Sequence, residues 1–203
     1  SSCTVYGMPD ILPVDENSPF KKASSPYGET KQLCEKMLLN NTCNSVSLRY
    51  FNPIGSHTSA LIGDCSSDKA SNIVPIITET VIGNRDKVTV FGNDYKTNDG
   101  TCIRDYIHVV DLAKSHVQAI KFIIANPGKH AFNVGTGKGI SVKNLILTFE
   151  KANNLKVNYS IGPRRSGDIE QIYANSNLIK EQLGWEAKES LEDALKSAWN
   201  WQK

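Results

Sequence analysis

The 203-residue sequence contains no long hydrophobic run, no excess of charge of one sign and no closely paired cysteines. No apolar stretch approaches the roughly 18–20 residues of a membrane-spanning helix, so we expect no membrane span. The 23 Lys and Arg residues nearly balance the 21 Asp and Glu residues, which gives no electrostatic argument for binding nucleic acid or an anionic membrane surface. The length suits one large domain, or one and a half small ones, with enough chain to bury a core.

The five cysteines are odd in number, and none belongs to a C-x-x-C pair. Free thiols in a reducing cytosol are therefore the expected state, rather than a disulfide scaffold or a zinc site. His57, His116 and His130 are scattered along the sequence, which predicts no metal centre. His108 lies in an apolar strand and is expected to be a satisfied core histidine rather than a catalyst. No basic and apolar leader is visible, and these features together predict a cytoplasmic protein.

The sequence also lacks the G-x-x-G-x-x-G loop that cradles a dinucleotide phosphate at a helix N-terminus. The glycine-rich stretch NVGTGKGIS, residues 133–141, lies late in the chain. The chain begins at Ser1 rather than at methionine, and its opening residues SSCTVYG are typical of the end of a buried strand that runs straight into a loop. We therefore expect that these residues lack the dinucleotide-binding half of a larger domain.

Strand-like and helix-like segments alternate along the chain, which predicts an α/β fold. Ser25 and Pro26 mark the start of a helix that is expected to run from about Tyr27 to Leu39. The predicted apolar side of this helix consists of Cys34, Met37 and Leu38.

The other predicted elements follow from apolar spacing and from their start and stop residues. Pro75 must lie in the first turn of its helix, Gly184 is a stop signal, and Ser190 with Asp193 forms a capping box. Helices are predicted over residues 72–83, 109–126, 141–154, 175–185 and 190–203, and strands over residues 46–51, 87–92, 102–109, 130–135 and 156–161.

The segment SPYGETK places Tyr27 and Lys31 four positions apart on the first predicted helix. Residues at this spacing share one face of a helix, with Cβ atoms about 5–6 Å apart. A free tyrosine has a pKa of about 10, and a nearby ammonium group lowers that value because it favours the phenolate. If Ser2 holds a substrate hydroxyl beside the phenol, the set suits a general base that takes a proton from an alcohol while hydride leaves.

Each of these signals also has a plain structural interpretation. Y-x-x-x-K is common by chance, and Tyr27 and Lys31 alone could be a solvated surface pair. Arg104 and Asp105 could be a structural ion pair, and Phe91 could belong to the core. The neighbouring motifs decide between the interpretations.

The motifs follow one another in the order SSCTVYG, SPYGETK, LRYFNPIG, VFGNDYKTNDGTCIRDYIHVVDLA, FNVGTG, PRRSGD and LGW. In this order, and over nearly the whole chain, they resemble the UDP-glucose 4-epimerases, which are extended short-chain dehydrogenases/reductases. The most specific stretch is FGNDYKTNDGTCIRDYIHV, whereas YGETK alone is weak. Related dehydratases carry acidic residues just after the Ser/Thr position, where this chain has Cys3 and Thr4, so the comparison favours the epimerases.

The resemblance implies an NAD-dependent interconversion of UDP-glucose and UDP-galactose. The sugar would be oxidised at carbon 4, rotate as the 4-keto sugar and be reduced again from its other face. The resemblance implies that Tyr27 is the base, that Lys31 favours the phenolate and holds the nicotinamide ribose, and that Ser2 bonds the reacting hydroxyl. Tyr50 and Phe51 match the residues beside the nicotinamide.

The resemblance assigns the UDP-sugar to a second set of residues. Arg104 and Arg165 match the family's diphosphate arginines, whose planar, permanent charge suits that group. The other implied contacts are Ser2, Cys3 and Thr4, the amides Asn52 and Asn72, the strand residues Thr89, Val90 and Phe91 with the Phe91 ring beside the uracil, and Asp168 at a ribose.

Two places depart from the family's pattern. Residues 56–75 match it poorly, and Ser71 stands where the family has the first of two asparagines. Ile172 occupies the position beside the carbon-2 substituent of the sugar. A large residue there excludes an N-acetyl group and a small one admits it, and isoleucine is intermediate.

These matches predict two parts of the fold. Residues 1–52 would be the C-terminal part of an NAD-binding Rossmann domain, and residues 53–203 mainly a smaller α/β UDP-sugar domain with segments that return to the Rossmann domain. The expected partners are a UDP-sugar and, in the full-length protein, a second copy in a homodimer, but neither nucleic acid nor a membrane. Two alternatives stay open: another nucleotide-sugar epimerase, or a naturally short, non-catalytic chain that binds a nucleotide sugar or a partner.

Overall fold

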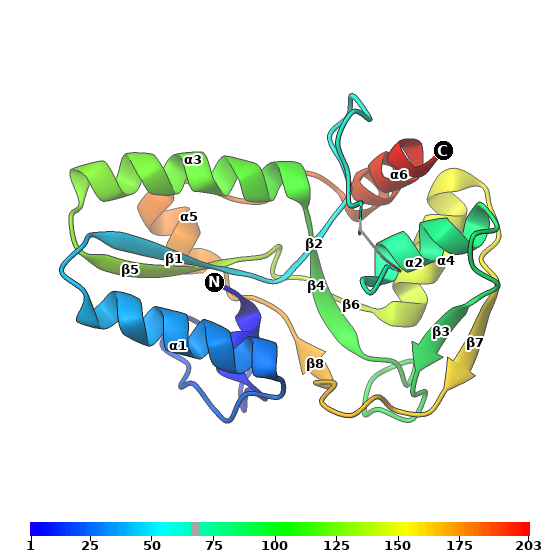
Figure 1. Ribbon diagram of the computed structural model, residues 1–203, viewed down its shortest axis with the longest axis horizontal. Helices are drawn as coiled ribbons and strands as arrows, with labels where there is room; N and C mark the ends of the chain where they lie inside the picture. Colours follow the sequence, from blue (N-terminus) through cyan, green and yellow to red (C-terminus); the bar gives the residue numbers. More distant parts are fainter. Residues whose placement is uncertain (66–69) are drawn as a thin grey trace.

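The computed structural model describes residues 1–65 and 70–203, and its elements form two groups side by side (Figure 1). Residues 66–69, within the poorly matched segment 56–75, lie outside the described residues. One group holds α1 (Pro26–Asn40), β1 (Ser45–Tyr50), α3 (Val109–Ala125), β5 (Lys129–Val134) and α5 (Asn177–Leu183). The other holds α2 (Ile73–Val81), β3 (Val88–Phe91), α4 (Val142–Asn153), β7 (Tyr159–Gly162) and α6 (Leu191–Gln202).

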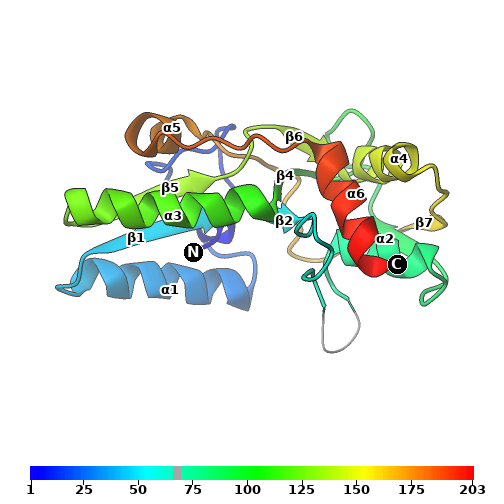
Figure 2. The ribbon, with the colours of Figure 1, turned by 90° about the horizontal axis from the view of Figure 1, so that it is seen from above.

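The first group is built on the parallel pair β1 and β5, in which residues 45–50 lie opposite residues 129–134. α3 and α5 pack on this pair around a core that includes Leu48, Phe132 and Ile179. α1 lies on the opposite side of the pair from α5 (Figure 2). The pair is therefore covered on both sides, as parallel strands require.

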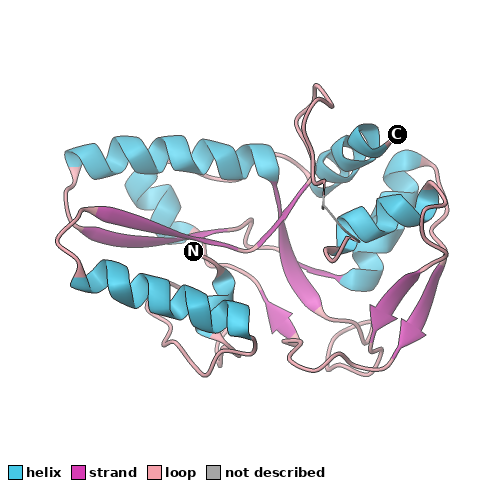
Figure 3. Cartoon of the chain, in the orientation of Figure 1, coloured by secondary structure: helices cyan, strands magenta, loops and turns pink. Residues whose placement is uncertain are grey.

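Four short strands lie between the groups: β2 (Asn52–Ile54), β4 (Ile103–His108), β6 (Gly139–Ser141) and β8 (Gln171–Ile172). β4 joins them, because it pairs in parallel with β2 near its end and, near its start, antiparallel with β6 and in parallel with β8. Figure 3 shows these strands running between the two sets of helices. β3 and β7 form a further parallel pair in the second group, whose core includes Ile77, Val90, Phe149 and Leu195.

The predicted helix boundaries are confirmed where a local signal fixes them. Ser25 caps α1 by accepting a hydrogen bond from the Gly28 N–H, with Pro26 in the first turn. Ser190 caps α6 in the same way through the Asp193 N–H. α5 ends at Gly184, which adopts a left-handed conformation with φ of 62°. The α/β class with parallel sheets is therefore confirmed, and within the described residues no helix has both the length and the apolar character to cross a bilayer.

One local prediction was confirmed in part and another was wrong. Ser2 pairs in parallel with Tyr50 as the end of a strand would, and Cys3–Tyr6 then form a 3₁₀ helix, η1, which the Ser2 side chain caps, rather than a loop. The apolar side of α1 is not its buried side, because Cys34 is exposed, Met37 is 71% exposed and the inner face of the helix is polar. The sequence therefore predicted the position of this helix along the chain correctly, but it assigned the wrong face of the helix to the interior.

Candidate active site

The predicted phenol and ammonium lie together at the start of α1. The Ser25 cap places Tyr27 in the first turn, one helical turn before Lys31. The Lys31 Nζ atom lies 5.2 Å from the centre of the Tyr27 ring. Tyr27 is 55% exposed, so its hydroxyl is accessible to a molecule that binds beside α1. The spacing predicted from the sequence therefore places the Lys31 ammonium over the Tyr27 ring, within the range of a cation–π contact.

Ser2 and Tyr50 meet at the carboxyl end of β1. Ser2 forms an isolated parallel bridge with Tyr50, and its hydroxyl accepts a hydrogen bond from the Thr4 N–H at 3.3 Å. Burial raises the pKa of the Tyr50 phenol, and a negative charge on Tyr27 would raise it further. Phe51, the other residue expected beside a nicotinamide, is buried in the core around η1. Ser2 and Tyr50 thus lie at the carboxyl end of β1, the edge at which ligands bind in open parallel sheets.

Most of the predicted substrate residues line two adjoining hollows. The volumes are about 300 Å³ and about 180 Å³. Four residues line both hollows: Asn52, Arg104, Arg165 and Asp168. The first hollow also includes Cys3, Thr4 and Ile172, and the second includes Asn72, Thr89, Val90 and Phe91.

The two arginines meet at one carboxylate. Arg165 donates to Asp168 from Nη2 at 2.7 Å and from Nε at 3.2 Å, and Arg104 Nη2 lies 3.8 Å from the same carboxylate. The hydrogen bond to Asp168 holds the pKa of Arg165 above its ordinary value. One carboxylate therefore faces two guanidinium groups, which leaves positive charge in the hollow for an anionic ligand.

An aromatic ring completes this cluster. The Arg165 guanidinium carbon lies 5.4 Å from the centre of the Phe91 ring. Phe91 ends β3 and is 39% exposed, whereas its neighbour Val90 is buried. The core interpretation of Phe91 is therefore wrong, and the ring is free to stack against a planar ligand group.

The hollows also contain polar atoms that lack partners. Thr4 Oγ1 and Asn52 Oδ1 are buried, and neither has a hydrogen-bond partner among the described residues. Buried polar atoms are nearly always paired, so such atoms in a cavity wall are available to a ligand. Burial raises the pKa of the Cys3 thiol to about 12, which keeps that thiol protonated and excludes it as a nucleophile.

The structural interpretation of Arg104 and Asp105 as an ion pair is also wrong. Asp105 is fully buried and accepts hydrogen bonds from the N–H groups of Thr136, Gly137 and Ala174 and from the Thr136 hydroxyl. Arg104 points to Asp168 instead. These two successive residues of β4 therefore have different roles. Arg104 faces the hollow, and Asp105 holds the backbone of two neighbouring segments in place.

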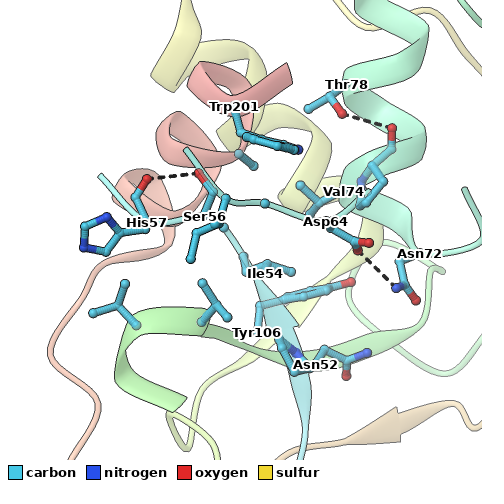
Figure 4. A pocket seen from close by; sticks show the side chains of 18 of the residues that line it. Asn52, Ile54, Ser56, His57, Asp64, Asn72, Val74, Thr78, Tyr106 and Trp201 are labelled. Carbon is cyan, nitrogen blue, oxygen red and sulfur yellow. Dashed lines mark hydrogen bonds between the residues drawn. The ribbon is translucent and has the colours of Figure 1, made fainter. Parts of the chain in front are cut away.

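A larger cavity, of about 620 Å³, lies elsewhere (Figure 4). It is enclosed by the segment after β2, by α2 and by the ends of α3 and α6, with apolar walls such as Ile54, Val74 and Trp201. Of the predicted site residues only Asn52 and Asn72 line it, and Asn72 donates to Asp64 at 3.4 Å. The phenol and the two arginines are not part of it, so the candidate site is assigned to the smaller hollows.

Sequence reasoning missed some residues of the site. Ser24, Ser166 and Gly167 line the first hollow. Beside these residues but outside both hollows, the Arg164 guanidinium carbon lies 4.1 Å from the centre of the Tyr95 ring. The doubled arginine of PRRSGD was the available signal for Arg164, but a short polar sequence does not reveal which loop its side chain reaches.

The expectation for His108 is confirmed. It is buried, its Nδ1 accepts from the Val110 N–H at 3.1 Å and its Nε2 lies 3.3 Å from the Ser197 hydroxyl. Both ring nitrogens are therefore engaged in the structure. Across residues 1–65 and 70–203, no cluster of three or more His, Cys, Asp or Glu side chains is placed to hold a metal ion.

A parallel α/β fold with a Tyr-Lys pair at the strand ends defines a protein of the Rossmann type. Residues 1–198 match the family described as GDP-mannose 4,6 dehydratase, and the chain belongs to that family.

Among its relatives, the chain is 44% identical over 210 residues to the UDP-glucose 4-epimerase of Drosophila melanogaster, and it spans 60% of that protein's length. It superposes with a TM-score of 0.96 and 42% identity on a UDP-glucose 4-epimerase of Stenotrophomonas maltophila crystallised with bound NAD and formylated UDP-arabinopyranose, covering all of this chain and 61% of that one. It also superposes with a TM-score of 0.93 and 41% identity on the UDP-glucose 4-epimerase of Bifidobacterium longum in complex with NAD+ and UDP. That match covers all of this chain and 62% of the other. The similarity is thus to the epimerases within the family.

Proposed function

We propose that this chain is the part of an NAD-dependent UDP-glucose 4-epimerase that binds the UDP-sugar and supplies its proton-transfer residue. The observation that carries the proposal is the joint placement of two groups. A phenol with its ammonium neighbour lies at the end of β1, and two arginines with an exposed ring line the hollows nearby. Relatives that are 41–44% identical are UDP-glucose 4-epimerases, two of them crystallised with NAD.

In this proposal the Tyr27 phenolate, which the Lys31 ammonium favours, takes the proton from the hydroxyl at carbon 4 and becomes the neutral phenol. Ser2 holds the same hydroxyl in place. NAD, when bound, accepts the hydride from carbon 4 and returns it. The oxidation is needed because the hydrogen at carbon 4 has no neighbouring carbonyl group, so it is not acidic enough for direct removal by a base.

The substrate residues divide by chemistry. Arg104 and Arg165 bind the diphosphate, and Phe91 packs beside the uracil on the strand formed by Thr89 and Val90. Asp168 reaches a ribose hydroxyl when the arginines turn to the phosphates. The remaining contacts come from Cys3, Thr4, Asn52 and Asn72.

In this proposal NAD is bound partly by residues of this chain and partly by residues outside the 203. The residues of this chain that fit its nicotinamide end are Tyr27, Lys31 and Tyr50 at the end of β1, with Phe51 packed behind them. The glycine loop for its phosphates has no match in the 203 residues, and the chain spans about 60% of its relatives. We therefore assign residues 1–52 to the NAD-binding domain and residues 53–203 mainly to the UDP-sugar domain. The pairing of β5 with β1 supports segments that return to the first domain.

The experiment that tests the proposal uses a chimera. The part of the Drosophila melanogaster relative that this chain does not cover is joined to residues 1–203, giving what we call the completed protein. Incubated with NAD and UDP-galactose, it is expected to form UDP-glucose, and deuterium placed at carbon 4 is expected to remain in the sugar. A product lighter by one water would indicate a dehydratase, and UDP binding without turnover would indicate a non-catalytic chain.

The diphosphate assignment predicts a large loss of binding for one arginine and not for its neighbour. Arg165→Met in the completed protein is expected to weaken UDP binding by about 30-fold or more, because losing one partner of a charge-assisted pair costs about 2–5 kcal/mol. Arg164→Met is the matched control, since Arg164 engages Asp94 and Tyr95 on the surface. Titration calorimetry measures both, and equal losses would contradict the assignment.

We also propose that the completed protein is a cytoplasmic homodimer. The five free cysteines suit a reducing compartment. The outer face of α1 exposes Leu33 and Met37, one turn apart, which suits a helix-to-helix contact between two copies. Sedimentation of the completed protein is expected to give a dimer, and Leu33→Glu with Met37→Glu is expected to give a monomer.

A further inference from the structure

The buried face of α1 makes directional polar contacts with the rest of the protein. Gly28 and Glu35 are its only residues that are fully buried. With Gln32 they stand at positions i, i+4 and i+7, so they form one face of the helix. Leu33 and Met37, which a helix would normally bury, point outward. Polar contacts of this kind are directional, so they fix the position of a helix along its own axis and its rotation about that axis.

Two of these contacts tie α1 to the segment that carries Ser2. The Gln32 side-chain amide donates to the backbone oxygens of Val5 and Lys21, both at 2.7 Å. A Cβ atom on Gly28 would lie 3.1 Å from the Thr4 backbone oxygen, so the two segments approach closely there. Val5 and Thr4 belong to η1, the turn that Ser2 caps.

The third contact is a buried ion pair. Arg49 donates to Glu35 from Nε at 3.0 Å and from Nη2 at 2.7 Å, and the two side chains are only 6% and 4% exposed. Arg49 lies on β1, one residue before Tyr50. Its Nη1 also donates to the Tyr6 hydroxyl at 2.9 Å, and that hydroxyl donates to Asn133 at 2.6 Å. The pair therefore links α1, η1 and both strands of the first sheet.

We propose that Gln32 and Glu35, with Arg49 as the partner of Glu35, are positioning residues for the proton transfer. They set the height and rotation of α1 and so the position of the Tyr27 phenol relative to Ser2. Tyr27 and Lys31 each precede a member of the polar face by one residue, so a small slide or turn of the helix moves both. The inference rests on the proposed function, because it assigns a task to residues that touch neither substrate nor cofactor.

The test compares charge-removing variants of the completed protein. Glu35→Gln is expected to lower kcat by about 100-fold with little change in KM for UDP-galactose, because a misplacement of about 1 Å can cost that much. Glu79→Gln is the matched control, since Glu79 of α2 also pairs with an arginine through two hydrogen bonds, from Arg85 at 2.9 and 3.1 Å. Its kcat is expected to stay within about twofold of the unmodified protein.

A double variant separates positioning from stability. Glu35→Leu with Arg49→Met removes both buried charges, and such replacements often restore or increase stability. The melting temperature is therefore expected to recover relative to Glu35→Gln, while kcat is expected to stay low because the directional contacts are gone. Recovery of kcat together with the melting temperature would overturn the proposal.

An NMR measurement tests the positioning role without relying on enzymatic activity. In residues 1–203 labelled with ¹³Cζ-tyrosine, the signal lost in Tyr27→Phe identifies Tyr27. Glu35→Gln and Gln32→Leu are expected to shift that signal, and Glu79→Gln is expected to leave it in place. An unmodified completed protein that fails to epimerise would refute the proposed function, whereas an unmoved signal in both α1 variants would refute the positioning role.

Discussion

Tyr27→Phe in the completed protein is expected to lower kcat by about 10³-fold or more and to leave UDP affinity unchanged. The substitution removes one hydroxyl from a side chain that is 55% exposed and keeps the ring beside Lys31, so the fold loses little. General acid–base catalysis by a positioned side chain contributes typically about 10²–10⁴-fold. The phenol is assigned both the removal and the return of the proton, which puts the expected loss in the upper part of that range.

The measurement is the steady-state rate with UDP-galactose, together with calorimetry for UDP. Tyr159→Phe is the matched control, because Tyr159 lies on β7 against the second core and also keeps its ring. Its rate is expected to be unchanged. If Tyr27→Phe kept more than about a tenth of the rate, another group would have to accept the proton and the base assignment would be wrong.

The phenol and its ammonium could be predicted from the sequence because their relation is local. A spacing of four residues in a helix that begins at Ser25-Pro26 fixes their distance without any knowledge of the fold. The ends of α5 and α6 were predictable for the same reason, since Gly184 and Ser190 act on adjacent backbone. The hollows around Arg104 were expected only through resemblance, because they join segments far apart in the chain.

The polar attachment of α1 was beyond sequence reasoning. Apolar periodicity assigns Met37 to the inside, whereas Met37 is exposed and Glu35 is buried. A buried carboxylate is acceptable only when a partner is provided, and that partner, Arg49, lies on another element. Amphipathic pattern thus located the helix, but the long-range ion pair decided which face is buried.

Asp105→Ala is expected to cost the largest free energy of unfolding of any single change considered, about 3–5 kcal/mol. The carboxylate is fully buried and accepts four hydrogen bonds, at 2.6, 2.8, 2.9 and 3.1 Å, from two segments after β5 and β8. Alanine leaves those donors without partners in a space that water cannot readily fill. A Cβ on Gly135 would lie 2.5 Å from the carboxylate, so the neighbouring backbone is fitted closely around it.

Denaturant unfolding of residues 1–203 measures the change. Asp193→Ala is the control, since Asp193 accepts its hydrogen bond at the exposed start of α6 and its loss is expected to cost about 1 kcal/mol.

Asp105 also holds the backbone at Ala174, two residues beyond Ile172, which pairs with Arg104 across β8 and β4. Under conditions where Asp105→Ala remains folded, we therefore expect weaker UDP binding as well, because β8 loosens from the strand that carries Arg104. Normal UDP affinity with reduced stability would show that the hydrogen bonds to Asp105 support the fold without setting the geometry of the site.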